Sequence, residues 1–348
     1  MGSSLTLLII VIVLALAFDY INGFHDTANA VATVVSTNVL PGRTAVLLAA
    51  AFNFIGAFVG VGVAKTIGGD IAAPSSVTQT VVAMALLSAI IWNLLTWYRG
   101  IPSSSSHALV GGLIGAIWGH RLMAGDAPSD AIWGLLTSKG VLLTLKALVL
   151  SPLIGMLGGF TLMVLLIWSV RRMRPTAVNR KFKSLQLVSA SCMAFAHGSN
   201  DAQKSMGVIT MALAAFAASR HPEASTPDLH VPTWVIIACA TAMAFGTASG
   251  GWRIMRTMGH RIIKMRPING FAAETSATIV ILVATWLRAP VSTTHVISSS
   301  IMGVGASKRV SAVRWGVAKN IFVAWVLTIP ITAILAAGLY ILCHQLFG

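Results

Sequence analysis

The sequence predicts an all-α polytopic membrane protein with two inverted-topology repeats, each containing a broken helix and a re-entrant hairpin. Apolar runs near or above the roughly 20 residues that span hydrocarbon recur along the chain, and polar motifs interrupt them in the same order in both halves. Of the 348 residues, 56% are hydrophobic and only 9% are charged. Soluble domains average about 25% charged residues, so this composition excludes an ordinary soluble protein.

The distribution of basic residues fits a multi-pass membrane protein, which we expect to lie in a bacterial-type inner membrane. The formal net charge is +15, but the Lys and Arg residues cluster in a few short segments, as the positive-inside rule places them on the cytoplasmic side. With both termini outside, the outer loops hold only Lys65, Arg121, Lys139 and Arg220. We therefore expect the lipid bilayer, and no nucleic acid, as a partner, and we consider a homodimer as the assembly.

A polar island lies inside the first apolar run and is expected to break its helix. It comprises residues 22–29, Asn-Gly-Phe-His-Asp-Thr-Ala-Asn, and follows the almost wholly aliphatic residues 5–18. A similar island, His-Gly-Ser-Asn-Asp-Ala-Gln-Lys, occupies residues 197–204. An ionisable side chain is costly in lipid, so its presence within a span indicates a functional site.

The two halves carry the same elements in the same order. Residues 1–170 form the predicted first repeat, residues 171–184 a basic cytoplasmic linker, and residues 185–348 the second repeat. Apolar runs occupy residues 5–40, 45–67, 77–98, 108–119 and 140–170, and then 185–216, 231–251, 268–287, 296–306 and 315–347. The motif Pro-Ser-Ser-Ser-Ser-His at 102–107 matches Pro-Val-Ser-Thr-Thr-His at 290–295. Three crossings per half, an odd number, place the halves in opposite orientations.

Residues 77–119 and 268–306 are predicted to form re-entrant hairpins, because each ends in an apolar stretch too short to complete a second crossing. Each predicted tip is a cluster of hydroxyl residues: Ser104, Ser105 and Ser106 in the first half, and Ser292, Thr293 and Thr294 in the second. If a helix begins just after each tip, its free N–H groups and positive dipole end add to the hydroxyl donors. Such a tip can bind an anion; the alternative is a surface loop with an ordinary helix cap.

Asp26 and Asp201 are the corresponding acidic residues of the two islands. A buried carboxylate must be paired, bind a cation or be protonated. Asn22, Asn29 and Asn200 lie near them in the sequence and offer carbonyl oxygens, so we expect a monovalent cation or a proton to be held here. The alternative is a hydrogen-bond network that only holds the helices together.

Two further ionisable residues, Lys204 and Glu274, have more than one interpretation. Lys204 follows Asp201 by three residues, where the first half has Asn29, and either neutralises the aspartate or meets an anion. Glu274 is a candidate cation ligand or proton carrier, or else forms a structural salt bridge with Arg288 or Lys204.

His107 and His295, which follow the hairpin tips, are expected to brace them as neutral side chains rather than to titrate. We predict no enzyme and no catalytic residues, because mirrored pairs of His and Asp suit a translocation site better than a one-sided active site. No resident cofactor and no metal site is expected. An ion channel is the alternative from another class of membrane protein, and gradient-driven accumulation of a substrate would exclude a channel.

The motifs resemble those of the PiT family of inorganic phosphate transporters over essentially the whole chain. The matching segments are Asn22 to Ala30, His197 to Lys204, Gly270 to Glu274 and Pro290 to His295. The resemblance implies alternating-access symport of inorganic phosphate, driven by sodium or protons, with the substrate between the hairpin tips and two Asp-bearing broken helices.

Carried over onto this sequence, the family's paired aspartates are Asp26 and Asp201, and its hairpin hydroxyls are the six residues named above. To the substrate-binding residues we add Asn200 and Lys204. The coupling residues are completed by Asn22, Asn29 and Glu274.

Two departures from the family pattern favour protons over sodium as the coupling cation. Many sodium-coupled members have a Glu in the second span, where this chain reads Ala-Phe-Asn-Phe at 51–54, and His25 replaces the Asn common before the first Asp. Both features are similar to the bacterial branch that carries metal–phosphate complexes, which are therefore a candidate form of the substrate. Alternatives within the family are a sodium-coupled phosphate symporter and a permease for sulfate or another tetrahedral oxyanion.

Overall fold

The second half of the chain repeats the helix order of the first in the computed structural model, which describes residues 4–70, 77–220 and 230–347. The first half consists of α1 (Leu5–Ser36), α2 (Gly42–Gly56), α3 (Gly62–Asp70), α4 (Gln79–Arg99), α5 (Ser105–Met123), α6 (Pro128–Leu136) and α7 (Lys139–Val170). The second half consists of α8 (Pro175–Arg220), α9 (Thr233–Ser249), α10 (Trp252–Arg256) with a π-helical continuation at Thr257–Arg261, α11 (Pro267–Trp286), α12 (Thr293–Ala306), a 3-10 turn at Val310–Ala312 and α13 (Trp315–Phe347).

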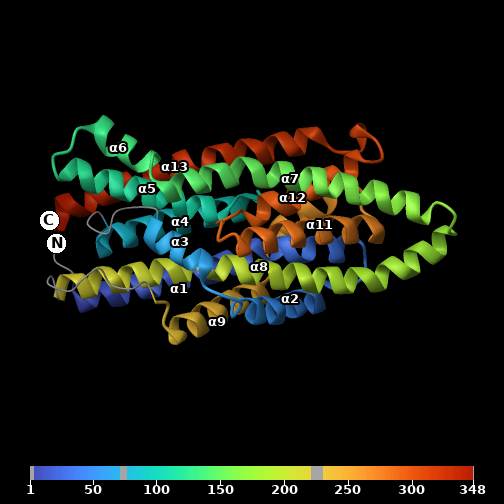
Figure 1. Ribbon diagram of the computed structural model, residues 1–348, viewed down its shortest axis with the longest axis horizontal. Helices are drawn as coiled ribbons and strands as arrows, with labels where there is room; N and C mark the ends of the chain where they lie inside the picture. The colour runs from blue at the N-terminus through green and yellow to red at the C-terminus, as the bar shows by residue number, and fades with distance from the viewer. Residues whose placement is uncertain (1–3, 71–76, 221–229, 348) are drawn as a thin grey trace.

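The helices form an elongated bundle in which most of them run along the long axis (Figure 1). Within the described residues, five helices are long and apolar enough to cross a membrane, or six if the bent pair of α9 with α10 and its continuation is one span. The predicted all-α polytopic membrane fold is confirmed. Residues 175–184 of the basic segment form the beginning of α8. The nine-residue α6 is too short for the apolar runs to predict.

The broken helices of the two repeats are not the ones that carry the aspartates. α1 and α8 run uninterrupted through both polar islands, so the prediction that the islands break their helices is wrong. The islands contain no proline, and their side chains bond to neighbouring helices or back to their own helix, as Thr27 Oγ1 does to the Gly23 carbonyl oxygen at 2.6 Å. The breaks instead separate α2 from α3 and α9 from α10. They lie at Gly60 (φ +83°) and Gly250 (φ +75°), in the left-handed region that glycine adopts without strain.

Each half contains a helical hairpin that extends along only part of the bundle. α4 and α5 lie towards one end and α11 and α12 towards the other (Figure 1). The helices after the tips begin as predicted, because Ser104 and Ser292 cap α5 and α12. Each serine hydroxyl accepts a hydrogen bond from the backbone N–H three residues later, at 3.2 Å.

The two repeats are interlocked. The hairpin helix α5 packs against α13 of the second half, while α12 packs against α7 of the first; likewise α1 packs against α9, and α8 against α2. Glycines of the two islands permit the last two contacts. A Cβ added at Gly23 would lie 2.4 Å from the carbonyl oxygen of Met243 in α9, and one added at Gly198 would lie 2.2 Å from that of Asn53 in α2. The island glycines therefore make the same close approach in both halves.

We expect Gly198→Ala to destabilise the protein, because the added methyl group forces α8 away from α2, and overpacking of this kind costs about 1–3 kcal/mol. Gly338→Ala in α13 is the matched control, since nothing lies within 4 Å of a Cβ added there. Thermal unfolding of the purified variants in detergent should give a lower midpoint for the first variant and an unchanged or slightly higher one for the control. Equal midpoints would contradict the role assigned to Gly198.

Candidate functional site

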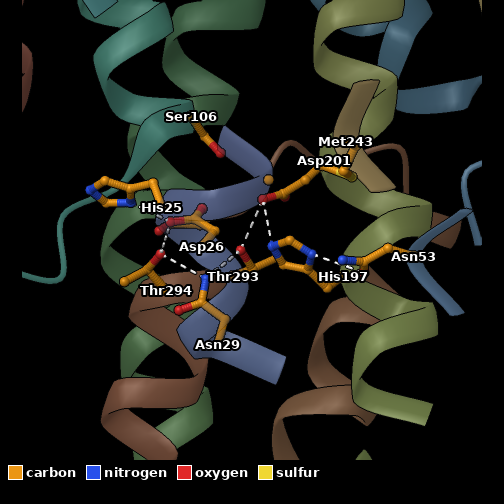
Figure 2. A network of polar contacts seen from close by, with 12 residues as sticks. His25, Asp26, Asn29, Asn53, Ser106, His197, Asp201, Met243, Thr293 and Thr294 are labelled. Carbon is orange, nitrogen blue, oxygen red and sulfur yellow. Dashed lines mark hydrogen bonds and ion pairs between the residues drawn. The ribbon is translucent and has the colours of Figure 1, made fainter. Parts of the chain in front are cut away.

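Asp26 of α1 and Asp201 of α8 lie opposite each other, next to hydroxyl residues of the hairpin tips (Figure 2). Both residues are buried, with 2% and 0% of their surface exposed. One oxygen of each carboxylate and a ring nitrogen of His197 lie within 4.8 Å of one another, so these three residues could hold a metal ion. The repeated motif predicts the pairing of the aspartates, but it gives no indication that a histidine joins them.

Asp26 is held by a histidine and by the tip of the second hairpin. His25 Nδ1 lies 2.7 Å from its Oδ1, and Thr294 Oγ1 donates to the same oxygen at 3.3 Å. Asn29, one turn further along α1, donates to Thr293 and Thr294 at 3.3 and 2.9 Å. The first island is therefore bound to the hairpin of the other half.

Asp201 forms a buried ion pair with Lys204, three residues further along α8. The Lys204 ammonium also donates to Ser106 Oγ of the first hairpin tip at 2.5 Å and to the Val291 carbonyl oxygen of the second at 3.0 Å. The other carboxylate oxygen of Asp201 accepts from Thr293 Oγ1 at 3.1 Å. Of the two interpretations of Lys204, neutralisation of Asp201 is the one that these contacts fit.

The residues that precede the two aspartates make matching contacts with the hairpins. His25 Nε2 lies 3.1 Å from Thr96 Oγ1 near the end of α4, and Asn200 Nδ2 donates to Thr285 Oγ1 near the end of α11 at 2.9 Å. Both threonines stand at corresponding positions of the two hairpins. The two-fold relation inferred from the motifs thus extends to individual side-chain contacts.

His197 and Asn53 belong to the site but were not predicted to. His197 Nε2 lies 3.3 Å from Asp201 Oδ2, and its Nδ1 lies 3.1 Å from Asn53 Oδ1 of α2. His197 precedes Asp201 by four residues, so an unbroken helix places both on one face. A helix break in the island, as expected from the sequence, would not place His197 and Asp201 on one face, so the pairing was not predicted.

The six hairpin hydroxyl residues are all at most 5% exposed, which excludes the surface-loop alternative. Ser106, Thr293 and Thr294 contact the islands, whereas Ser104 and Ser292 cap their helices. The hydroxyl of the remaining residue, Ser105, is buried without a hydrogen-bond partner in the described part of the chain.

The asparagines of the islands keep unused acceptors. Among the described residues, Asn22 Oδ1, Asn29 Oδ1 and Asn200 Oδ1 are buried and accept no hydrogen bond. An unpaired buried acceptor is costly in free energy. Amide oxygens are also ligands for hard cations, so all three asparagines offer chemistry that suits a coupling ion.

Glu274 of α11 lies apart from the aspartate pair and has neither of the salt-bridge partners considered from the sequence. It is fully buried and accepts hydrogen bonds from Thr33 of α1 at 2.5 Å, from Gln186 of α8 at 3.1 Å, and from Ser189 of α8. Thr33 is seven residues beyond Asp26, about 10 Å along the helix. Glu274 therefore joins three helices through neutral donors.

His107 and His295 join the two hairpins to each other. Their rings are in edge-to-face contact with centroids 4.6 Å apart, and His295 stacks on Trp325 of α13 at 3.9 Å. All four ring nitrogens are buried without hydrogen-bond partners among the described residues. This packing agrees with a bracing role for both histidines.

Comparison with known proteins agrees with the geometry. A model of the phosphate transporter family matches the chain twice, over residues 22–179 and 170–336, one match in each half. A protein of Bacillus subtilis (strain 168) described as a "probable low-affinity inorganic phosphate transporter" is 48% identical over 347 residues, covering 99% of both chains. A protein of Rhizobium meliloti (strain 1021) with the same description is 48% identical over 335 residues, covering 96% of both.

A solved structure has the same fold. It is described as "the sodium-dependent phosphate transporter" and covers 99% of this chain and 100% of its own with a TM-score of 0.82, at 24% sequence identity. With two interlocked repeats, paired aspartates between two hairpin tips and a double match to the family model, this chain belongs to the phosphate transporter family.

Proposed function

We propose that the protein is a secondary symporter of inorganic phosphate that is coupled to a cation, with the proton favoured over sodium. The charge balance at the aspartate pair is the observation that carries the proposal. Two carboxylates have oxygens within 4.8 Å of each other, and Lys204 is the one lysine or arginine in the described chain that pairs with them. If His25 and His197 are counted as neutral, one negative charge is left over, and in a desolvated site it repels an incoming anion strongly.

A cation or proton that binds at this site cancels the remaining charge. It removes the repulsion between the site and a divalent anion, so that binding of the cation favours binding of phosphate, and the reverse holds equally. Asp26 is the carboxylate to be neutralised, because Asp201 already has the ammonium of Lys204 as its counter-ion.

The hairpin tips supply the donors for the anion. The N-termini of α5 and α12 have free backbone N–H groups next to the tip hydroxyls, the arrangement that binds phosphate at helix N-termini. Ser106, Thr293 and Thr294 then exchange their contacts with the islands for contacts with phosphate, and Asn200 and Lys204 complete the site.

Lys204 also supports protons over sodium. Its ammonium contacts Asp201, Ser106 Oγ and the Val291 carbonyl oxygen, a set of oxygen ligands that a sodium ion would otherwise take. At the corresponding place in the first half, the chain has a neutral side chain, Asn29. The chain therefore supplies one of the two positive charges itself and requires only one mobile cation.

Alternating access follows from the interlocked repeats. Each hairpin packs on a long helix of the other half, α5 on α13 and α12 on α7, so that one hairpin can move with the opposite half while the other stays. We place both termini outside in an inner membrane, which puts the segment around Arg171 to Arg174 on the cytoplasmic side.

Uptake into proteoliposomes tests the proposal directly. Labelled phosphate and labelled sulfate are offered separately, with sodium and proton gradients imposed one at a time. Accumulation of phosphate driven by the proton gradient is expected. Accumulation of sulfate instead, or a requirement for sodium, would replace the proposal with one of the two family alternatives, and downhill flux without accumulation would indicate a channel.

We expect Asp26→Asn and Asp201→Asn each to reduce phosphate uptake by more than about 100-fold. The first substitution removes the carboxylate that takes the coupled cation, and the second breaks a buried charge pair, which costs about 3–5 kcal/mol. The purified variants should still be folded and monodisperse, because asparagine preserves the shape of the side chain. Uptake by both variants near the level of the unchanged protein would refute the mechanism.

Lys204→Asn places in the second half the residue that the first half has. Asp201 then lacks its counter-ion, so we expect proton-driven uptake to fall and sodium to stimulate what remains. Lys319→Asn in α13 is the control, because Lys319 is exposed and outside the site. If sodium does not stimulate uptake by Lys204→Asn, the ammonium of Lys204 does not replace a mobile cation.

A further inference from the structure

Asp19 of α1 is a second buried carboxyl group, and neither the motifs nor the proposed site accounts for it. The residue is 0% exposed, and neither of its carboxylate oxygens has a hydrogen-bond partner among the described residues. It precedes Asp26 by seven residues, about two helical turns or roughly 10 Å along the same helix. It therefore lies on the outer side of the aspartate pair in the topology proposed above.

The surroundings of Asp19 come from two other helices. Ser205 of α8 and Cys239 of α9 are the polar side chains beside it, and the Ser205 hydroxyl also has no hydrogen-bond partner in the described chain. Asp201 and Lys204 of α8 act on it electrostatically. Among the described residues, Asp201, Lys204 and Cys239 are the titratable groups that interact with Asp19.

A carboxyl group buried in this way must be paired with a positive charge, bound to a metal ion or protonated. Lys204 is the nearby positive charge, but its ammonium is bound to Asp201, Ser106 and Val291. Sodium and other hard cations take several oxygen ligands, whereas the neighbouring helices offer Asp19 one hydroxyl and one thiol. Protonation remains, and the unpaired Ser205 hydroxyl is an acceptor for the O–H of a neutral Asp19.

We propose that Asp19 is the entry site of the coupled proton on its route to Asp26, and that Lys204 transmits the protonation state of Asp19 to the first hairpin tip. This inference rests on the proposed proton-coupled symport. With Asp19 protonated, Lys204 has Asp201 as its counter-ion and holds Ser106. When the Asp19 O–H bond breaks and the proton passes through water to the Asp26 carboxylate, the Asp19 carboxylate competes with Asp201 for the ammonium, which keeps its own protons. Lys204 then moves towards Asp19, releases Ser106 and frees the tip of the hairpin.

The test uses the full-length protein in proteoliposomes and compares Asp19→Asn, Asp19→Glu and the unchanged chain. Asparagine imitates the protonated state permanently. We expect Asp19→Asn to lose proton-driven accumulation and the proton movement that accompanies phosphate, both by about tenfold or more, the scale of a typical coupling free energy. Exchange of labelled for unlabelled phosphate, which needs no net proton transfer, should be affected far less. Asp19→Glu should restore the coupling.

Asp126→Asn is the matched control, because Asp126 is an exposed carboxylate paired with Arg121 at the surface. It should leave accumulation and proton movement as they are in the unchanged protein. A second measurement does not depend on transport. The infrared C=O band of a protonated carboxylic acid should be present in the purified protein and absent from Asp19→Asn.

The outcomes separate this inference from the proposed function. If the unchanged protein moves no protons with phosphate, the proposed function fails. If it does, and Asp19→Asn accumulates phosphate with the same proton movement, Asp19 is not the proton site. Should Asp19→Asn fail to fold, Asp19→Glu decides: coupled uptake supports the inference, and phosphate exchange without proton movement overturns it. Absence of the infrared band from the unchanged protein also overturns it.

Discussion

The interaction on which the rest of the structure depends is a buried cluster of two carboxylates and one ammonium, formed by Asp26, Asp201 and Lys204. Desolvating these charges is expensive, and the cost is offset only if each is surrounded by donors or by opposite charge. Neighbouring helices supply those groups: threonines of the second hairpin tip bind the aspartates, and a serine of the first binds the ammonium. The need to satisfy the cluster therefore explains why two hairpins end in hydroxyl residues in the middle of the bundle.

The same need explains why the repeats interlock rather than form separate bodies. A single repeat has one aspartate and one hairpin tip, and in this fold the tip of one half closes over the island of the other, as Asn29 with Thr294 and Lys204 with Ser106 show. Gly23 and Gly198 allow α1 to approach α9 closely and α8 to approach α2 closely. The structure is thus complete only when both halves are in place, and a relative movement of the halves necessarily rearranges the contacts of the cluster.

Much of this arrangement can be predicted from the sequence, because short motifs recur in the same order in both halves. The motifs predict Asp26, Asp201 and the hydroxyl residues of the hairpin tips, among them Ser104. Features that depend on partners far away in the sequence cannot be predicted in this way. The islands stay helical because groups such as Asn53, 144 positions from His197, satisfy their side chains. Glu274 has neutral donors from α1 and α8 where a charged partner was expected. Asp19 belongs to no motif, and only its burial between α8 and α9 distinguishes it from an ordinary polar residue at the end of an aliphatic run.

In the proposed mechanism, the point at which the symmetry fails determines how ions and substrate are coupled. If positions 29 and 204 were both lysine, each aspartate would have its own counter-ion and the cluster would be neutral. No mobile cation would then be needed to admit an anion. If both positions were asparagine, two mobile cations would be required. With one asparagine and one lysine, the cluster is short of one positive charge. In the proposed mechanism the chain thereby requires a single mobile charge, and the ammonium of Lys204 beside Asp19 is the means by which that charge acts on the hairpin tip.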